Sequence, residues 1–142
     1  MMAVDTNILV FAHREETILH KAALERLKSL ALGRDLWALP IFCLGEFVRV
    51  VTHSKLFDPP STLTEAFENM RSLMESPSLR LLYPGEQFVS FFEELCSEGK
   101  AMGNLAFDAQ IVAVMREHGV ESILTEDRDF RRFERVRVLT VS

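Results

Sequence analysis

The sequence lacks any apolar run that approaches the roughly 18 residues needed for a membrane-spanning helix. Its apolar runs, such as residues 41–44, are each followed closely by a charged residue. The first five residues, MMAVD, also lack the basic region of a signal peptide and already include an acid, Asp5. We therefore expect a soluble protein that is not secreted and has no membrane partner.

Cysteine and histidine are scarce as well. The two cysteines, Cys43 and Cys96, stand apart in apolar surroundings without C-x-x-C spacing, which favours two reduced thiols over a disulfide. This usage indicates a cytoplasmic protein. The four histidines are scattered without the spacing of metal ligands, so the pattern predicts neither a zinc site nor a converging histidine pair for acid–base catalysis.

An excess of basic charge is also absent. The chain has 16 Lys and Arg residues against 21 Asp and Glu residues, which gives a formal net charge of -5. This balance excludes a broadly basic, histone-like surface, although it permits a local basic patch. The distribution of the acids therefore becomes the informative question.

The composition is that of one globular domain. The chain has 142 residues, of which 48% are hydrophobic, enough for one sizeable core. No internal repeat or low-complexity tract is present, and the strongest interruption, DPPS at residues 58–61, is typical of a loop within a domain. We expect residues 1–142 to form a single domain.

Hydrophobic periodicity predicts strands alternating with helices along the whole chain. Strands are expected at residues 1–4, 36–39, 79–83, 121–124 and 136–141. Helices are expected at residues 8–13, 19–30 after a Thr17 N-cap and before Gly33, 41–51, 64–74, 88–95 up to Gly99, and 105–118 before a Gly119 C-cap, with a short polar helix near 127–133. This alternation predicts an α/β fold whose central, mainly parallel sheet of about four to five strands is covered by helices on both faces.

Four acids stand where solvated charges are not expected. Asp5 and Asp127 follow predicted strands, and Glu46 and Asp108 lie in helices that are apolar nearly all the way round and are therefore expected to be buried. An unpaired carboxylate in such a place costs several kcal/mol, and few basic residues lie nearby to pair with these acids. A divalent cation shared between the four carboxylates resolves the problem.

The predicted topology supports such a shared site. Ligand sites of open parallel sheets lie beyond the carboxyl ends of the strands, where Asp5 and Asp127 are expected, and Glu46 and Asp108 would face them from helices. A cluster of oxygen ligands without His or Cys suits Mg²⁺ or Mn²⁺. Each acid also has a plainer interpretation: Asp5 and Asp127 as N-caps, Glu46 at an exposed helix edge, and Asp108 favouring a helix dipole.

Four segments carry a resemblance to a known family. They are VDTNIL at residues 4–9, LGEFVRVVT at 44–52, GNLAFDA at 103–109 and LTEDRDF at 124–130. In this order they resemble the acidic motifs of the PIN domain family, and within it the VapC-type toxin ribonucleases. The resemblance spans nearly the whole chain, and it implies a PIN-like fold.

Carried over residue by residue, the resemblance implies an acidic metal site made by Asp5, Glu46, Asp108 and Asp127, with Asn7 and Thr125 as supporting polar groups. The closing motif contains a second aspartate, Asp129, which could share or take the role of Asp127. The resemblance also implies a Mg²⁺- or Mn²⁺-dependent endoribonuclease, a homodimer, and a VapB-like antitoxin that blocks the active site. At such a site a metal-activated water would cleave the RNA phosphodiester.

Two other functions fit part of the pattern. A PIN-like module could bind RNA or a partner protein without cutting it, although the presence of all four acids argues against a degenerate site. A haloacid dehalogenase-like phosphatase also begins with a strand that ends in Asp, but it requires a second Asp where this chain has Asn7. A phosphotransfer receiver domain would require a late Lys, and none follows Lys100.

A basic segment beside the last acidic motif is the candidate for holding RNA. Arginine accounts for 12 of the 16 basic residues, and five arginines lie within residues 128–137. The planar guanidinium suits phosphate better than a Lys point charge. Arg128 and Arg131 are the predicted RNA contacts; the alternative is a solvated helix face balanced by Asp129 and Glu134. The eleven phenylalanines are mostly at helical core spacing, which favours packing over base stacking.

Overall fold

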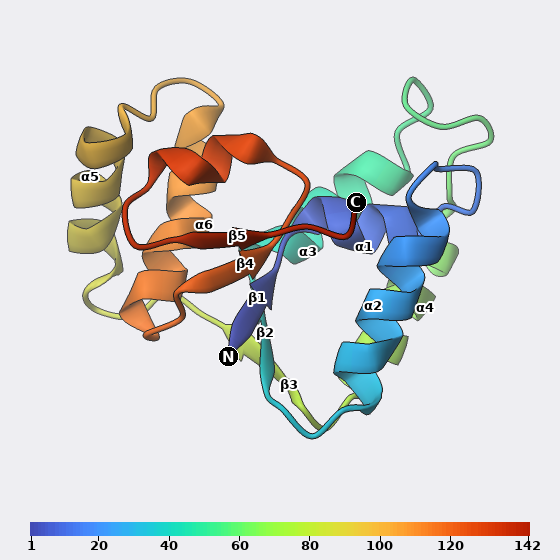
Figure 1. Ribbon diagram of the computed structural model, residues 1–142. Coiled ribbons are helices and arrows are strands. Elements are labelled where there is room, and N and C mark those ends of the chain that lie inside the picture. The colour runs from blue at the N-terminus through green and yellow to red at the C-terminus, as the bar shows by residue number, and fades with distance from the viewer.

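The computed structural model describes residues 1–142, and its centre is a sheet of five parallel strands (Figure 1). The strands are β1 (Met2–Val4), β2 (Trp37–Pro40), β3 (Leu79–Leu82), β4 (Ser122–Leu124) and β5 (Arg137–Leu139). Their order across the sheet is β3-β2-β1-β4-β5, and every neighbouring pair is parallel. The prediction of an α/β fold with a parallel sheet is confirmed.

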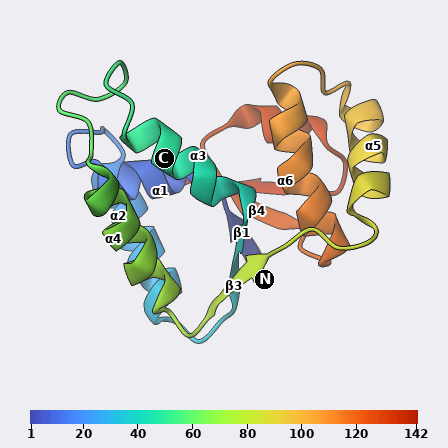
Figure 2. The ribbon, with the colours of Figure 1, turned by 180° about the vertical axis from the view of Figure 1, so that it is seen from behind.

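Helices lie on both sides of this sheet. They are α1 (Thr6–His13), α2 (His20–Leu32), α3 (Phe42–Val51), α4 (Leu63–Met74), α5 (Phe88–Gly99), α6 (Leu105–Glu117) and the short 3₁₀ helix η1 (Arg128–Arg132). In both views α5 and α6 pack together at one side, and α1, α2 and α4 gather at the other (Figures 1 and 2). Helix α3 connects the two groups because it contacts α1, α4 and α6. None of the helices is long and apolar enough to cross a membrane.

The middle of the sheet is the centre of the hydrophobic core. All four residues of β2 and all three of β4 are buried, as expected for strands covered on both faces. Trp37 and Leu39 of β2 are fully buried, and α6 contributes an unbroken buried run from Ile111 to Met115. The edge strands β3 and β5 are only partly buried. The core therefore fixes the positions of the strand ends from which the site is built.

The helix starts differ from two predictions. Thr17 is not an N-cap: the second helix begins at His20, and the Thr17 hydroxyl instead donates to the carbonyl oxygens of Phe11 and Arg14 in the preceding turn. Helix α1 begins at Thr6, two residues before the predicted start, because the Asp5 carboxylate caps it. Asp5 directly follows β1 and directly precedes α1, so the residue that leaves the strand is also the N-cap of the helix.

The helix ends predicted at Gly33 and Gly119 are both confirmed, although the two glycines differ in conformation: α2 ends at Leu32 with Gly33 as its C-cap, and α6 ends shortly before Gly119. Gly119 has a φ of +71°, the left-handed conformation that terminates a helix without a Cβ clash. Gly33 has a φ of -79° and is extended. At the end of α5, Gly99 is the last helical residue, and Lys100 adopts the left-handed conformation instead.

Helix α3 is not buried on all sides, contrary to expectation. Its buried residues Cys43, Phe47 and Val51 recur every fourth position, whereas Gly45 and Arg49 are exposed. The helix is amphipathic, and valines and a leucine on its flanks are only half-buried. Both cysteines of the chain are free thiols, as predicted.

Candidate metal centre

The site begins where two neighbouring strands end together. Val4 of β1 is in register with Leu124 of β4, so Asp5 and Thr125 leave the sheet side by side at its carboxyl edge. The Asp5 backbone N–H donates to the Leu124 carbonyl oxygen over 3.0 Å, which continues the ladder by one residue. Residues 120 positions apart in the sequence are thereby held together by the sheet.

A network of hydrogen bonds orients Asp5. Its Oδ1 accepts from the Thr6 backbone N–H (2.7 Å), and its Oδ2 accepts from the Thr125 hydroxyl (2.7 Å) and the Asn7 amide (3.2 Å). The same Asn7 amide reaches Thr125 Oγ1 (3.0 Å), and the Glu126 N–H donates to Asn7 Oδ1. Thr125 is fully buried. Asn7 and Thr125 thus fix the direction in which the Asp5 carboxylate points.

Asp127 is positioned by the same hydroxyl. Its N–H donates to Thr125 Oγ1 (3.0 Å), while its Oδ1 accepts from the Asp129 N–H (2.9 Å) and caps η1. Asp5 and Asp127 are therefore both N-caps and both site residues, because a cap uses only part of a carboxylate. The two interpretations of these residues are compatible.

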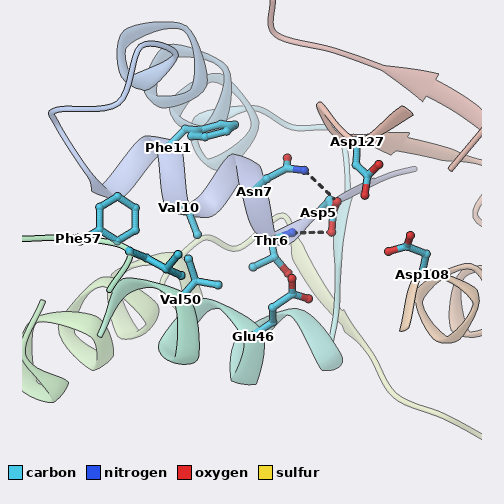
Figure 3. A pocket seen from close by; sticks show the side chains of 11 residues that line it. Asp5, Thr6, Asn7, Val10, Phe11, Glu46, Val50, Phe57, Asp108 and Asp127 are labelled. Carbon is cyan, nitrogen blue, oxygen red and sulfur yellow. Dashed lines mark hydrogen bonds between the residues drawn. The ribbon is translucent and has the colours of Figure 1, made fainter. Parts of the chain in front are cut away.

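Glu46 and Asp108 complete the arrangement from two helices. Glu46 lies in the middle of α3 and Asp108 in the first turn of α6, and both side chains are half-buried. Figure 3 shows the carboxylates of Asp5, Asp108 and Asp127 beside one another, with Glu46 below them. The four acids that the sequence singles out line one pocket of about 330 Å³.

This acidic pocket has a polar and an apolar half. The polar half is lined by Asp5, Thr6, Asn7, Glu46, Asp108 and Asp127, and the apolar half by Val10, Phe11, Val50, Leu56 and Phe57. A second, larger pocket of about 750 Å³ shares Glu46, Asp108 and Asp127 with it. Three of the four acids therefore lie where the two pockets meet.

Burial, together with the neighbouring acids, raises the pKa values of two of the four acids. Burial raises the pKa of Asp108 to about 7, and the neighbouring charges of Asp127 and Asp5 add to the shift. Burial likewise raises the pKa of Asp5 to about 6, although the hydrogen bonds from Thr125 and Thr6 oppose it. None of the ion pairs in the structure involves the four acids. The repulsion between them is not compensated by a basic side chain.

The residues present fit a hard divalent cation. Carboxylate oxygens of Asp108, Asp127 and Asp129 lie within 4.8 Å of one another, and no His or Cys lines either pocket. The Thr6 hydroxyl is buried in the polar half and has no hydrogen-bond partner, so a further oxygen is free there. An all-oxygen set that carries excess negative charge suits Mg²⁺ or Mn²⁺.

The second aspartate of the closing motif lies close to the site but faces a different hollow. Asp129 lines the larger pocket and not the acidic pocket, its side chain is 53% exposed, and it lies 3.9 Å from Arg132. Asp127 lines both pockets. The two aspartates of the closing motif therefore differ in the pockets that they line, although carboxylate oxygens of both lie within 4.8 Å of Asp108.

The predicted basic contacts lie outside both hollows. Arg128 and Arg131 are exposed on η1 and line neither pocket, whereas Arg49 of α3 is exposed and lines the larger one. The sequence analysis does not single out Arg49 as an RNA contact. The sequence signal for Arg49 is its position three residues after Glu46 on a helix, which places the two side chains on adjoining faces.

Sequence reasoning also missed Thr6 and the apolar half of the acidic pocket. Thr6 stands between Asp5 and Asn7 in the opening motif, so its position was a usable signal. Leu56 and Phe57 belong to the loop between α3 and α4 and have no periodic pattern. Only the folded chain brings this loop against α1.

The fold and this pocket define an α/β protein with carboxylates gathered at the carboxyl edge of a parallel sheet. The family model of the PIN domain matches residues 2–136, and the chain belongs to the PIN domain family. It is 35% identical to a VapC ribonuclease of Mycobacterium bovis, over 96% of this chain and 92% of that protein. It is 33% identical to ribonuclease VapC48 of Mycobacterium tuberculosis, over 94% and 92% of the two chains.

Solved structures share the fold at lower identity. The crystal structure of VapBC2 from Rickettsia felis, bound to a promoter DNA fragment, has a TM-score of 0.70 at 17% identity and covers 98% of this chain and 97% of its own. That of Mycobacterium tuberculosis VapC20, a sarcin-ricin loop cleaving toxin, has a TM-score of 0.68 at 21% identity, covering 96% and 99%. Membership of the PIN domain family excludes the alternatives of a phosphatase and of a receiver domain.

Proposed function

We propose that this protein is a Mg²⁺- or Mn²⁺-dependent endoribonuclease, the toxin of a VapBC-type toxin–antitoxin pair. The observation that carries the proposal is the meeting of four carboxylates from separate parts of the chain in one pocket without a basic partner. The relatives named as VapC ribonucleases support it, since they match over nearly the whole of both chains.

Asp5, Glu46, Asp108 and Asp127 are the proposed metal ligands and catalytic carboxylates. Asp127 is favoured over Asp129 as the fourth ligand because only Asp127 lines the pocket that contains Asp5. Asn7 and Thr125 act through Asp5 and Asp127 by fixing their orientation. Asp129 would then either bind the cation from the outer side of the cluster or orient Asp127.

The chemistry follows from this placement. A bound divalent cation lowers the pKa of a coordinated water and neutralises charge on a phosphodiester. The chain holds the four carboxylates at the carboxyl edge of a rigid sheet, so little reorganisation is required when substrate binds. In the metal-free protein the pKa of Asp108 is raised to about 7, so this carboxyl would release its proton when a cation binds.

RNA would be held on the basic surfaces that flank the acids. Arg49 lines the larger pocket, and Arg128 and Arg131 are exposed on η1 without an ion-pair partner. Arginines beside a phosphate chain add affinity that falls as salt rises. We expect substitution of Arg49 to weaken RNA binding at least as much as substitution of Arg128 or Arg131.

The proposal extends to partners and organisation. A VapB-like antitoxin that covers the acidic pocket would silence the enzyme, and we propose a homodimer as the toxin's own assembly. Residues 1–142 are proposed to form one domain, which a single cluster of 29 buried hydrophobic residues supports. Two free cysteines are consistent with the proposed cytoplasmic location.

The decisive experiment uses purified protein, free of antitoxin, and total RNA. The RNA is incubated with Mg²⁺, Mn²⁺ or EDTA, and the cut sites are mapped by primer extension. We expect metal-dependent cuts at few positions, and none from a folded Asp108→Asn variant. Absence of cuts with every divalent ion would instead favour a PIN-like module that binds without cutting.

A further inference from the structure

The acidic pocket continues beyond its carboxylates into an apolar hollow that the proposed metal chemistry does not use. Val10 and Phe11 of α1, Val50 of α3, and Leu56 and Phe57 of the following loop line it. In Figure 3 the Phe57 ring lies at the end opposite Asp108 and Asp127, with Val10 and Val50 between, and the Phe11 ring lies above Val10. The pocket thus runs from charged to apolar within one cavity.

Helix geometry produces this gradient. On α1, Val10 stands four residues after Thr6, and Phe11 four residues after Asn7, so each apolar side chain lies one turn beyond a polar one on the same face. On α3, Val50 follows Glu46 at the same spacing. One turn is about 5.4 Å. An occupant must therefore present an anionic or metal-binding group and, a short distance away, a flat apolar one.

The aromatic wall of the hollow is held in place. The Arg14 guanidinium lies 4.6 Å from the centre of the Phe57 ring, a cation–π contact. Arg14 is itself anchored, because it donates to Ser61 Oγ (3.0 Å) and to the Pro59 carbonyl oxygen (2.7 Å). A ring fixed in this way offers a preformed surface, so binding against it loses little conformational entropy.

We infer that the apolar half of the acidic pocket is a subsite for a nucleobase of single-stranded RNA next to the bond that is cut, with Phe57 as its stacking surface. The inference rests on the proposed ribonuclease function. A nucleotide matches the gradient of the pocket because the ribose alone separates its phosphate from its base. Unpaired bases stack on aromatic side chains in single-stranded RNA recognition.

The lining also indicates how the base is read. The five apolar residues present no side-chain donor or acceptor to a base edge. Recognition by stacking and shape tolerates every base, because each has a π-face. The subsite therefore requires that a base be present and discriminates weakly between the four bases.

The test is an abasic scan of a short RNA. A twelve-nucleotide single strand centred on a mapped cut is prepared with one base at a time replaced by an abasic residue, and kcat/KM is measured for each. In the wild-type protein, removal of one base beside the cut is expected to lower kcat/KM by roughly fivefold to a hundredfold. Exchange of that base for another is expected to have a smaller effect.

Variants of Phe57 assign the effect to the subsite. In Phe57→Ala and Phe57→Leu, removal of the same base should have no further effect, since the stacking partner is already missing. Phe57→Leu keeps an apolar side chain, so it decides the matter if Phe57→Ala does not fold. Phe67→Ala, an exposed phenylalanine of α4 outside both pockets, should retain the wild-type scan.

The outcomes separate the two proposals. If the wild-type protein cuts RNA and the scan is identical in Phe57→Leu, the base subsite is overturned while the ribonuclease function stands. If Phe57→Leu instead weakens only the binding of an antitoxin, the hollow is a protein-binding site and the inference is again overturned. If the wild-type protein cuts no RNA with any divalent metal, the proposed ribonuclease function is wrong, and the base subsite that rests on it is wrong as well.

Discussion

Carboxylates occupy two kinds of region in this molecule, and they behave in opposite ways. At the start of α4, Glu65 accepts from the Thr62 N–H in a capping box, and this backbone hydrogen bond lowers its pKa. In the acidic pocket, burial and neighbouring acids raise the pKa values of Asp5 and Asp108. Glu65 stabilises the fold, whereas Asp5 and Asp108 repel their neighbours.

The C-terminal end of the sheet shows the same contrast close to the site. Burial raises the pKa of Glu126, but hydrogen bonds from Ser142 and from the Val141 N–H (2.6 Å) outweigh it, so the pKa is lowered. Asp127, the next residue, faces the acidic pocket. Adjacent acids can therefore have unrelated tasks. The comparison teaches that an acid of the site is distinguished by burial beside other acids without a basic partner, which its hydrogen bonds do not offset.

The largest expected effect separates the two kinds of acid by activity. Asp108→Asn should lower RNA cleavage by more than about a hundredfold, because loss of a ligand exceeds the roughly 10- to 100-fold typical of outer-shell changes. Glu65→Gln, which preserves the capping box, should cleave as the wild type does. Cleavage rates and circular dichroism spectra of both variants provide the measurement. Full activity of a folded Asp108→Asn protein would contradict the assignment.

A smaller effect is expected from substitution of Thr125, which orients two of the acids but is not an acid itself. Thr125→Val removes the hydroxyl that donates to Asp5 and accepts from the Asp127 N–H, and should weaken Mg²⁺ binding by about 10- to 100-fold. Thr125→Ser restores the hydroxyl and should recover most of it. Isothermal titration calorimetry measures both affinities. Equal Mg²⁺ affinity in the valine variant and the wild type would show that the network is dispensable.

The raised pKa values predict a pH dependence of metal binding. Asp5, with a pKa of about 6, and Asp108, with a pKa of about 7, must lose their protons before a cation binds. Mg²⁺ affinity should therefore be lower at pH 5.5 than at pH 7.5, by roughly tenfold or more, and binding should release protons. Calorimetry in buffers of different ionisation enthalpy detects this release. A flat profile over this range would contradict the coupling between the acids.

The smallest effect concerns the stability of the metal-free protein. A carboxyl whose pKa is raised in the folded state binds more protons there than in the unfolded state. The contribution of Asp108 to the free energy of unfolding is therefore full below pH 3.8 and is lost as the pH rises to about 7. At pH 8, Asp108→Asn should therefore raise Tm, at roughly 2–4 °C per kcal/mol of relieved repulsion.

The control for that stability experiment is taken from the other kind of region. Thr62→Ala removes an N-cap hydroxyl and should lower the free energy of unfolding by about 1 kcal/mol at any pH between 5 and 8. Thermal denaturation of both variants with EDTA and with Mg²⁺ gives the comparison. Addition of Mg²⁺ should raise the Tm of the wild type and of Thr62→Ala, but not that of Asp108→Asn. A Tm for Asp108→Asn below that of the wild type at pH 8 would show that burial of the Asp108 charge and its repulsion by neighbouring acids do not destabilise the metal-free protein.

Much of the fold was predictable because its signals are local. The predicted strands lie within two residues of the observed ones. Short apolar runs bounded by turn residues predict strands, and those of β2 and β4 are buried throughout. The predicted burial of α3 is wrong because apolar residues on the flanks of a helix look the same in sequence whether or not another element covers them. The predicted Thr17 N-cap is wrong because a hydroxyl before a helix has several backbone partners within reach.

By itself, the sequence determined the family and singled out four acids that the fold brings into one pocket, because residue type and order along the chain carry that information. Which hollow each acid faces, the orphaned Thr6 hydroxyl, and the exposure of Arg49 beside the site depended on the tertiary structure. So did the apolar half of the acidic pocket, where a loop without periodicity meets α1. The physical reason is that a pocket is formed by side chains from separate segments, and their distances are decided by packing rather than by spacing in the sequence.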